Sequence, residues 1–187
     1  NVSTIWINGA EYPVKWTRLT NWVVTVPLHT GANLLGVAGV DLNGQFISGD
    51  TNSITVNYNT ATASPAGHVV INEIMSAPAV AGAEYVELYN NSPTTAFDLS
   101  GWQLQGLGYT FPSGTILAPT NFLVLAANRA SFAAAYGATV TPVFDTFRGT
   151  LSPSQTLALI QPGTTNTVIT QVRYQNSSPW PTNANGT

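Results

Sequence analysis

The fold is decided between Asn72 and Leu104, where the chain reads Asn72-Glu73-Ile74, then Glu84-Tyr85-Val86-Glu87-Leu88-Tyr89-Asn90, then Asp98-Leu99-Ser100-Gly101-Trp102-Gln103-Leu104. Each run is short and rich in apolar residues, and turn-forming residues separate the runs, which is typical of β-strands joined by loops. The same pattern continues almost to the end of the chain. The sequence therefore predicts strands over Val69–Ser76, Glu84–Asn90, Gly101–Gln105, Phe122–Ala126, Thr156–Gln161 and Thr167–Tyr174.

The first part of the chain also reads as short strands. Asn8-Gly9 and Asn43-Gly44 are hairpin signals, because both residue types tolerate the positive φ that a tight hairpin turn requires. Apolar side chains alternate with others over Trp22–Leu28, which predicts a half-buried strand. Leu34–Val40 is mostly apolar and is expected to be a central strand, and the alternation returns over Ile54–Tyr58.

One short helix is expected near residues 129–136. Asn128 can cap its first turn, and Phe132 and Tyr136 are four residues apart, so their rings share one helix face. Gly137 can then adopt the left-handed conformation that ends a helix.

An uncharged stretch separates the two strand-rich parts. It reads Ala61-Thr62-Ala63-Ser64-Pro65-Ala66-Gly67, and small or turn-prone residues of this kind neither pack into a core nor nucleate a helix. We therefore expect two domains, residues 1–60 and 68–187, joined by a linker at 61–67.

The composition narrows the classes of function. Only 7% of the residues are charged, whereas typical soluble domains have about 25%. The five Lys and Arg residues are scattered and the net charge is −3, which disfavours binding to nucleic acid. The absence of Cys excludes disulfides and thiolate sites, and no apolar run approaches the ~20 residues of a membrane-spanning helix. Such a surface suits an extracellular module, whose export signal would precede Asn1.

The run of motifs quoted first resembles the lamin tail domain. The resemblance spans residues 68–187, and it implies an immunoglobulin-like β-sandwich that also occurs in secreted bacterial proteins and is usually a module rather than an enzyme. The family normally has one more strand after its Trp-Pro turn, so an open edge strand is expected here. Further matching motifs are Phe111-Pro112-Ser113-Gly114-Thr115, Leu123-Val124-Leu125-Ala126, Leu157-Ala158-Leu159 and Pro179-Trp180-Pro181.

Residues 1–60 resemble the later strands of bacterial immunoglobulin-like repeats. The motifs that carry this resemblance are Trp6-Ile7-Asn8-Gly9, Gly31 followed by Asn33-Leu34, and Asp41-Leu42-Asn43-Gly44. About five strands are expected where an immunoglobulin-type sandwich has about seven, so the earlier strands are expected upstream. The fold class is therefore expected to be all-β, with tandem immunoglobulin-like β-sandwiches and one short helix.

Glu73, Glu84 and Glu87 are the clustered acids. Two of them on neighbouring strands could approach closely, and paired carboxylates can perform acid–base chemistry. Strict alternation places Glu73 on the same face as Ile71 and Met75, where a buried carboxylate needs a partner or a proton. The competing hypothesis is structural, with these acids bonded to backbone amides, a tyrosine hydroxyl or an arginine. The lamin tail resemblance favours the structural hypothesis, because that family has no known catalytic role for these acids.

A metal site near Asp41 is a second candidate. Asp41 and Asn43 supply oxygen ligands and Asp50 is close in sequence, but an EF-hand loop requires a bidentate Glu where this chain has Asn52. A tight hairpin explains the same residues, so we expect no metal and no cofactor and leave calcium near Asp41 open. No phosphate loop, dinucleotide fingerprint, zinc spacing or nucleophile elbow occurs in the sequence.

Aromatic residues provide the strongest indication of binding. The chain has five Trp residues, and an exposed indole can stack on a sugar ring because it is flat, apolar and rigid. Trp22 and Trp102 are expected in the core, which leaves Trp6 and Trp16 as candidate binding residues.

The sequence favours a non-catalytic module of a larger secreted or cell-envelope bacterial protein, which would space or dock other domains. Its partners would be neighbouring domains of the parent chain or other proteins, and the uncharged loop Ser76–Ala83 could dock one of them or simply connect two strands. The alternative is a carbohydrate-binding module that uses Trp6 and Trp16. An enzyme is supported only by the three glutamates, and a DNA-binding module only by analogy with nuclear lamins.

Overall fold

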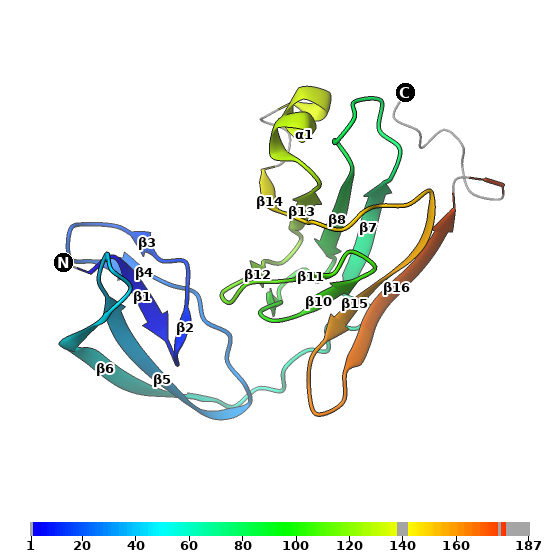
Figure 1. Cartoon of the computed structure of the whole chain (residues 1–187). Coiled ribbons are helices and arrows are strands. Elements are labelled where there is room, and N and C mark those ends of the chain that lie inside the picture. The colour runs from blue at the N-terminus through cyan, green and yellow to red at the C-terminus, as the bar shows by residue number, and fades with distance from the viewer. Residues whose placement is uncertain (1, 138–141, 176, 179–187) are drawn as a thin grey trace. The chain divides into compact units, whose positions relative to one another are not determined.

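The computed structural model describes residues 2–137, 142–175 and 177–178. The chain divides into two compact units, Asn1–Ala63 with Pro112–Ile116, and Ser64–Phe111 with Leu117–Thr187 (Figure 1). The boundary between Ala63 and Ser64 lies within the uncharged stretch 61–67. Strands dominate both units, which confirms the expected all-β class.

The first unit contains a four-stranded antiparallel sheet in the order β2-β1-β5-β6. Asn8 and Gly9 have φ values of 51° and 81°, so the turn between β1 and β2 has the positive φ values that the Asn-Gly pair predicts. Strand β5 lies between β1 and β6 and is central, as expected. The strands are β1 (Thr4–Ile7), β2 (Ala10–Glu11), β5 (Gly31–Val40) and β6 (Phe46–Tyr58).

A second, smaller hairpin in this unit pairs β3 (Lys15–Trp16) with β4 (Trp22–Val23). The expectation of a strand over Trp22–Leu28 is wrong beyond Val23, because only the first two residues pair. Pro27 has no backbone N–H for a continued ladder, and alternation by itself supplies no neighbouring strand to pair with.

The second unit contains two four-stranded sheets and one short strand pair. The sheet orders are β14-β13-β8-β7 and β11-β10-β15-β16, and β12 pairs with β9. The six expected strands are all present. The additional strands β9, β11, β12 and β14 have two to four residues, which is too short for alternation to reveal them. The motif around Trp180 and the expected open edge beyond it lie outside the described residues.

The strand bounds of the second unit are β7 (Val69–Met75), β8 (Tyr85–Asn90), β9 (Phe97–Asp98), β10 (Gln103–Gln105), β11 (Tyr109–Thr110), β12 (Ile116–Leu117), β13 (Phe122–Ala126), β14 (Val143–Thr146), β15 (Ser154–Gln161) and β16 (Thr167–Gln175).

The main core lies between the two sheets of the second unit. Val86, Leu88 and Leu125 come from one sheet, and Leu104 and Leu159 come from the other, and all five belong to one buried cluster. Burying such a side chain contributes about 1.5–3 kcal/mol. Trp102 joins this cluster and is 4% exposed, which confirms that its indole is a core group.

The helix α1 (Arg129–Tyr136) packs on the other face of the β8 sheet. The Asn128 side chain accepts hydrogen bonds from the backbone N–H groups of Ala130 and Ser131, which confirms the predicted cap. Gly137 ends the helix with φ 89° and ψ 142°, so its φ is positive but the predicted left-handed helical conformation is wrong. Within the described part of the chain, no helix has the length and apolar character to traverse a bilayer.

Candidate functional site

Glu73 and Glu87 are direct cross-strand partners on β7 and β8. Strict alternation fails here, because a β-bulge interrupts the pairing between Ile71 and Glu73. As a result Ile71 and Ile74 both pack against the main core, and Glu73 is on the opposite face of the sheet. The expectation that Glu73 shares a face with Ile71 is therefore wrong, although it does share one with Met75.

The two carboxylates accept hydrogen bonds from neighbouring side chains. The Asn72 amide, at the bulge, donates to Glu87 at 2.7 Å, and the Tyr85 hydroxyl donates to Glu73. Burial raises the pKa of Glu87, the Asn72 hydrogen bond lowers it, and the charge of Glu73 raises it further. Burial, the hydrogen bond and the Glu73 charge raise the pKa of Tyr85, so its hydroxyl stays a neutral donor.

The third acid, Glu84, precedes β8 and lies on the side of Tyr136. The Tyr136 hydroxyl is buried and has no hydrogen-bond partner among the described residues. Burial raises the pKa of Tyr136, and the charges of Glu73 and Glu84 raise it further. The structure thus brings the three predicted acids to one region, with Glu73 and Glu87 in direct register.

The chemistry open to this acidic region is limited by its surroundings. A raised pKa on one of two facing carboxylates is also found in catalytic acid–base pairs. Here, however, Glu73 is exposed on a sheet face and each of the paired acids already accepts a side-chain hydrogen bond. Among the described residues, no group of three or more His, Cys, Asp or Glu side chains is arranged to hold a metal ion.

Asp41 organises the turn between β5 and β6. Its carboxylate Oδ1 accepts hydrogen bonds from the backbone N–H groups of Asn43 at 2.8 Å and Gln45 at 2.9 Å. These hydrogen bonds hold the pKa of Asp41 below its ordinary value, the one from Gln45 contributing most. Gly44 takes a φ of 76° in the same turn, as the Asn-Gly signal predicts. The tight hairpin therefore accounts for these residues without an ion.

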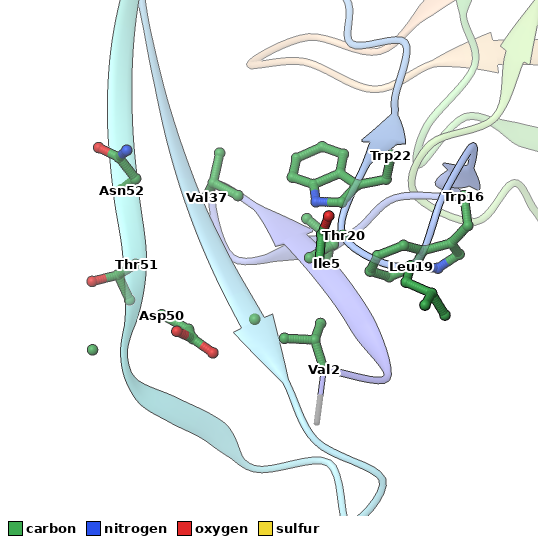
Figure 2. Close-up of a pocket in the computed structure, with 12 residues that line it drawn as sticks. Val2, Ile5, Trp16, Leu19, Thr20, Trp22, Val37, Asp50, Thr51 and Asn52 are labelled. Atoms are coloured by element: carbon green, nitrogen blue, oxygen red, sulfur yellow. The ribbon is translucent and has the colours of Figure 1, made fainter.

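A groove opens in the first unit between the β3–β4 hairpin and the sheet (Figure 2). Its volume is about 600 Å³, with Trp16, Leu19 and Trp22 on one side. Strand β6 lies on the other side, where Asp50 points toward the groove, while the side chains of Thr51 and Asn52 point away from the hairpin (Figure 2). Trp16 is 43% exposed, so of the two predicted binding residues this one presents its indole to a cavity.

Trp6 is placed differently. Its ring packs edge-on against Phe46, with 5.3 Å between the ring centres, and it is half-buried. Ile5, which precedes Trp6 on β1, lines the groove. Because side chains alternate along a strand, Trp6 is directed to the other face of the sheet. The structure does not bring Trp6 and Trp16 together. Trp22, expected in the core, instead lines the groove beside Trp16.

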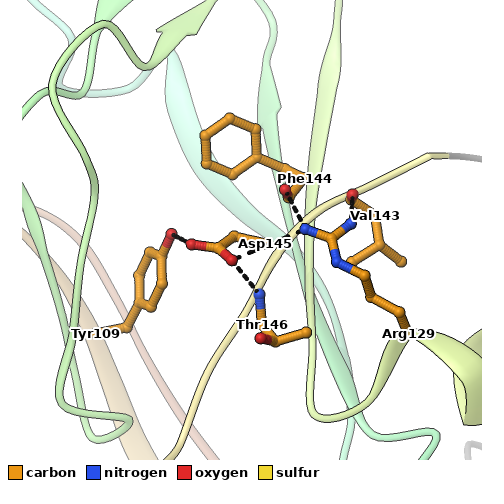
Figure 3. A network of polar contacts seen from close by, with 6 residues as sticks. All are labelled: Tyr109, Arg129, Val143, Phe144, Asp145 and Thr146. Carbon is orange, nitrogen blue, oxygen red and sulfur yellow. Dashed lines mark hydrogen bonds and ion pairs between the residues drawn. The ribbon is translucent and has the colours of Figure 1, made fainter. Parts of the chain in front are cut away.

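A polar network that the sequence does not indicate ties the second unit together (Figure 3). The Arg129 guanidinium donates to the carbonyl groups of Val143 and Phe144 and lies 3.8 Å from the Asp145 carboxylate. Asp145 also accepts a hydrogen bond from the Tyr109 hydroxyl at 2.7 Å. Because these residues are far apart in sequence, no local motif signals their contact. These contacts join α1, β14 and β11, and we interpret them as structural.

Comparison with protein families identifies a family for most of the second unit. A family model described as the Lamin Tail Domain matches residues 62–176. No curated protein sequence matches the chain. The matched region contains the second unit's strands from β7 to β16, the helix α1 and the three clustered glutamates.

Proposed function

Because the chain belongs to the lamin tail domain family, whose immunoglobulin-like fold is a non-catalytic module, we propose that it is a structural and interaction module of a larger protein. The parent would be a secreted or cell-envelope bacterial protein. The module would space or dock neighbouring domains of the parent chain or other proteins. The low proportion of charged residues, 7%, is consistent with an extracellular surface.

The hydrogen bonding of Glu73 and Glu87 carries the non-catalytic part of the proposal. A general acid or base acts on a substrate held beside it, usually in a cleft. Asn72 and Tyr85 orient these two carboxylates within their own sheet, and Glu73 is exposed on the sheet face. The groove described above is lined by residues 2–52 and contains neither glutamate. The acids are therefore assigned to the scaffold.

The loop between β7 and β8 is the surface that we assign to docking. Its residues Ser76–Ala83 are uncharged, and Val80 among them is exposed, whereas Ala83, just before Glu84, is fully buried and anchors the loop. An added side chain at Gly82 would meet the Ser131 hydroxyl at 3.0 Å, so the loop lies closely against α1. A loop held at its base and apolar at its tip suits contact with a neighbouring domain.

A turnover assay tests the non-catalytic part. The purified chain would be assayed against glycoside, phosphodiester and peptide substrates, together with Glu73→Gln, Glu87→Gln and the control Glu11→Gln. We expect no turnover that differs between the variants. Turnover that disappears in Glu73→Gln and Glu87→Gln while both keep the native circular dichroism spectrum, and persists in Glu11→Gln, would overturn the assignment.

Cell fractionation tests the proposed location. Antibodies against the chain would be applied to the medium, envelope and cytosol of the producing cell. We expect the parent protein in the medium or envelope. Detection in the cytosol alone would contradict the secreted or cell-envelope part and would leave the non-catalytic part unaffected.

The groove supports a second candidate function, carbohydrate binding through Trp16. Its indole is 43% exposed and lies beside a cavity, which is the arrangement a sugar-stacking residue requires. Retention on insoluble polysaccharides that is lost in Trp16→Ala would support this candidate. An absence of retention on every polysaccharide would count against it.

A further inference from the structure

We propose that the groove of the first unit is a subsite for an uncharged pyranose sugar, with Trp16 as the stacking wall and Asp50 as the hydrogen-bonding wall. This inference rests on the carbohydrate-binding candidate and adds the ligand class and the second wall. Figure 2 shows the two walls, with the indoles on the β3–β4 hairpin, Asp50 on β6, and Ile5 and Val37 between them.

The indole wall is formed by a hairpin whose loop is held in place. Trp16 and Trp22 are register partners on β3 and β4. The carbonyl of Asn21 accepts hydrogen bonds from the backbone N–H groups of Thr17 at 2.8 Å and Arg18 at 3.2 Å, which closes the loop between them. Because these hydrogen bonds already order the loop, stacking of a ligand on Trp16 would cost the protein little additional conformational entropy.

The facing wall offers unused hydrogen-bonding groups. Within the described residues, the side chain of Asp50 has no hydrogen-bond or ion-pair partner. The indole N–H groups of Trp16 and Trp22 also have none among those residues. Carboxylate oxygens across from an apolar ring match a pyranose, which has an apolar C–H face and a rim of hydroxyl groups.

Glycine lets the chain pack closely beneath Asp50 at the floor of this groove. A side chain at Gly39 would approach Val2 Cγ2 to 3.0 Å and Asp50 Cβ to 3.4 Å. Val2 and Asp50 can therefore approach the backbone of β5 here only because position 39 has no side chain. The volume of the open groove, about 600 Å³, lies within the range of small-ligand sites.

The charge of the lining selects among ligand classes. Among the described residues that line the groove, Asp50 is the charged one, so an anionic sugar or a phosphate would meet repulsion without a compensating cation from that lining. A wholly apolar segment would bury the Asp50 carboxylate without a partner, which is costly. An uncharged sugar avoids both penalties, because its hydroxyl groups can donate to Asp50 while its C–H face covers Trp16.

Calorimetric titration with defined oligosaccharides tests the subsite. The chain would be titrated with cello-, xylo-, manno- and chito-hexaose as neutral probes and with hexagalacturonate as the anionic probe. We expect at least one neutral probe to bind with one site per chain and hexagalacturonate to bind at least about tenfold more weakly. Trp16→Ala and Asp50→Ala should each weaken binding of that probe by about tenfold or more.

Leu42→Ala is the matched control, because Leu42 is an exposed apolar residue of the same unit that does not line the groove. Its affinity should equal that of the unmodified chain, and circular dichroism should show that all three variants keep the fold. Binding that persists unchanged in Trp16→Ala and Asp50→Ala would overturn the subsite, although the chain would still be a carbohydrate-binding module. Binding of none of the probes would overturn the subsite and the carbohydrate candidate together, and the non-catalytic module would remain. Tighter binding of hexagalacturonate would overturn the assigned ligand class.

Discussion

The hydroxyl of Tyr109 on β11 donates a 2.7 Å hydrogen bond to the carboxylate of Asp145 on β14, and these strands belong to the two different sheets of the second unit. Burial of the ring, the hydrogen bond to Asp145 and its charge raise the pKa of Tyr109, while Arg129 lowers it. Tyr109 therefore remains a neutral donor at ordinary pH. Tyr109 also belongs to the buried cluster between the sheets, so this contact adds a polar link to the apolar packing there.

Tyr109→Phe is expected to lower the free energy of unfolding by about 1.5–3 kcal/mol, because the half-buried Asp145 carboxylate loses the donor to its Oδ2 atom and keeps only the partners of Oδ1. Urea denaturation followed by circular dichroism measures the change. Tyr58→Phe is the control, since Tyr58 lies on the edge strand β6, and it should change stability by no more than about 0.5 kcal/mol. Equal losses in the two variants would contradict the assigned role of the Tyr109 hydrogen bond.

Glu87→Gln is expected to stabilise the protein at pH 7 by up to about 1 kcal/mol. Burial and the Glu73 charge raise the pKa of Glu87 in the folded protein. The Glu87 side chain therefore contributes its full stability below the pKa of an unfolded glutamate, near 4.3, and this stability is lost as pH rises through the pKa of the folded state. Glutamine removes that loss and can still accept the Asn72 hydrogen bond. The urea midpoint of the variant should therefore exceed that of the unmodified chain at pH 7, and the two midpoints should be equal at pH 3.5. A difference of equal size at both pH values would contradict the expectation.

Alkaline pH should weaken the second unit through Tyr174. Burial raises the pKa of Tyr174 to about 12, and its hydroxyl donates to the Ser152 carbonyl at 2.9 Å. A raised folded pKa gives stability that is complete below the unfolded value near 10 and is lost as pH rises toward 12. Melting temperatures between pH 9 and pH 12 should fall in the unmodified chain and fall less in Tyr174→Phe. An identical slope in the two proteins would show that Tyr174 makes no contribution.

Asn90→Ala is expected to cost about 3 kcal/mol or more. The Asn90 side chain is fully buried and its amide donates to the carbonyl groups of Thr95, Leu117 and Ala118 at 2.8, 3.1 and 3.0 Å. Removing it leaves these acceptors without their donor. Asn91→Ala is the matched control, because Asn91 is the exposed neighbour, and it should cost no more than about 1 kcal/mol. Similar losses would contradict the special role of Asn90.

The local pattern predicts elements whose cause is local. Asn8-Gly9 and Asn43-Gly44 mark real turns because the required positive φ belongs to the residues themselves. The Asn128 cap and the Phe132–Tyr136 face are likewise properties of one short segment. Where pairing partners decide the outcome, the pattern fails: Trp22–Leu28 alternates well but only Trp22–Val23 forms a strand.

The candidate sites show the same division. The sequence selects Trp6 and Trp16 because they are not expected in the core. Only the folded chain places Trp16 beside a groove and Trp6 on the other face of the sheet. Asp50 becomes a binding candidate because the fold places it on the same groove as Trp16, a residue more than thirty positions earlier in the sequence. Tyr109 and Asp145 meet for the same kind of reason, since each is carried by a short strand of a different sheet.

The sequence by itself determined the strand-rich fold and the lamin tail resemblance, because periodicity, turn residues and ordered motifs are properties of neighbouring positions. Only the tertiary structure decided where Glu73 points. One extra residue at the β7 bulge turns both Ile71 and Ile74 toward the core and sets Glu73 against Glu87 on the opposite face. A bulge arises from the register between two strands, and register depends on how both strands pack, so no single stretch of sequence specifies it.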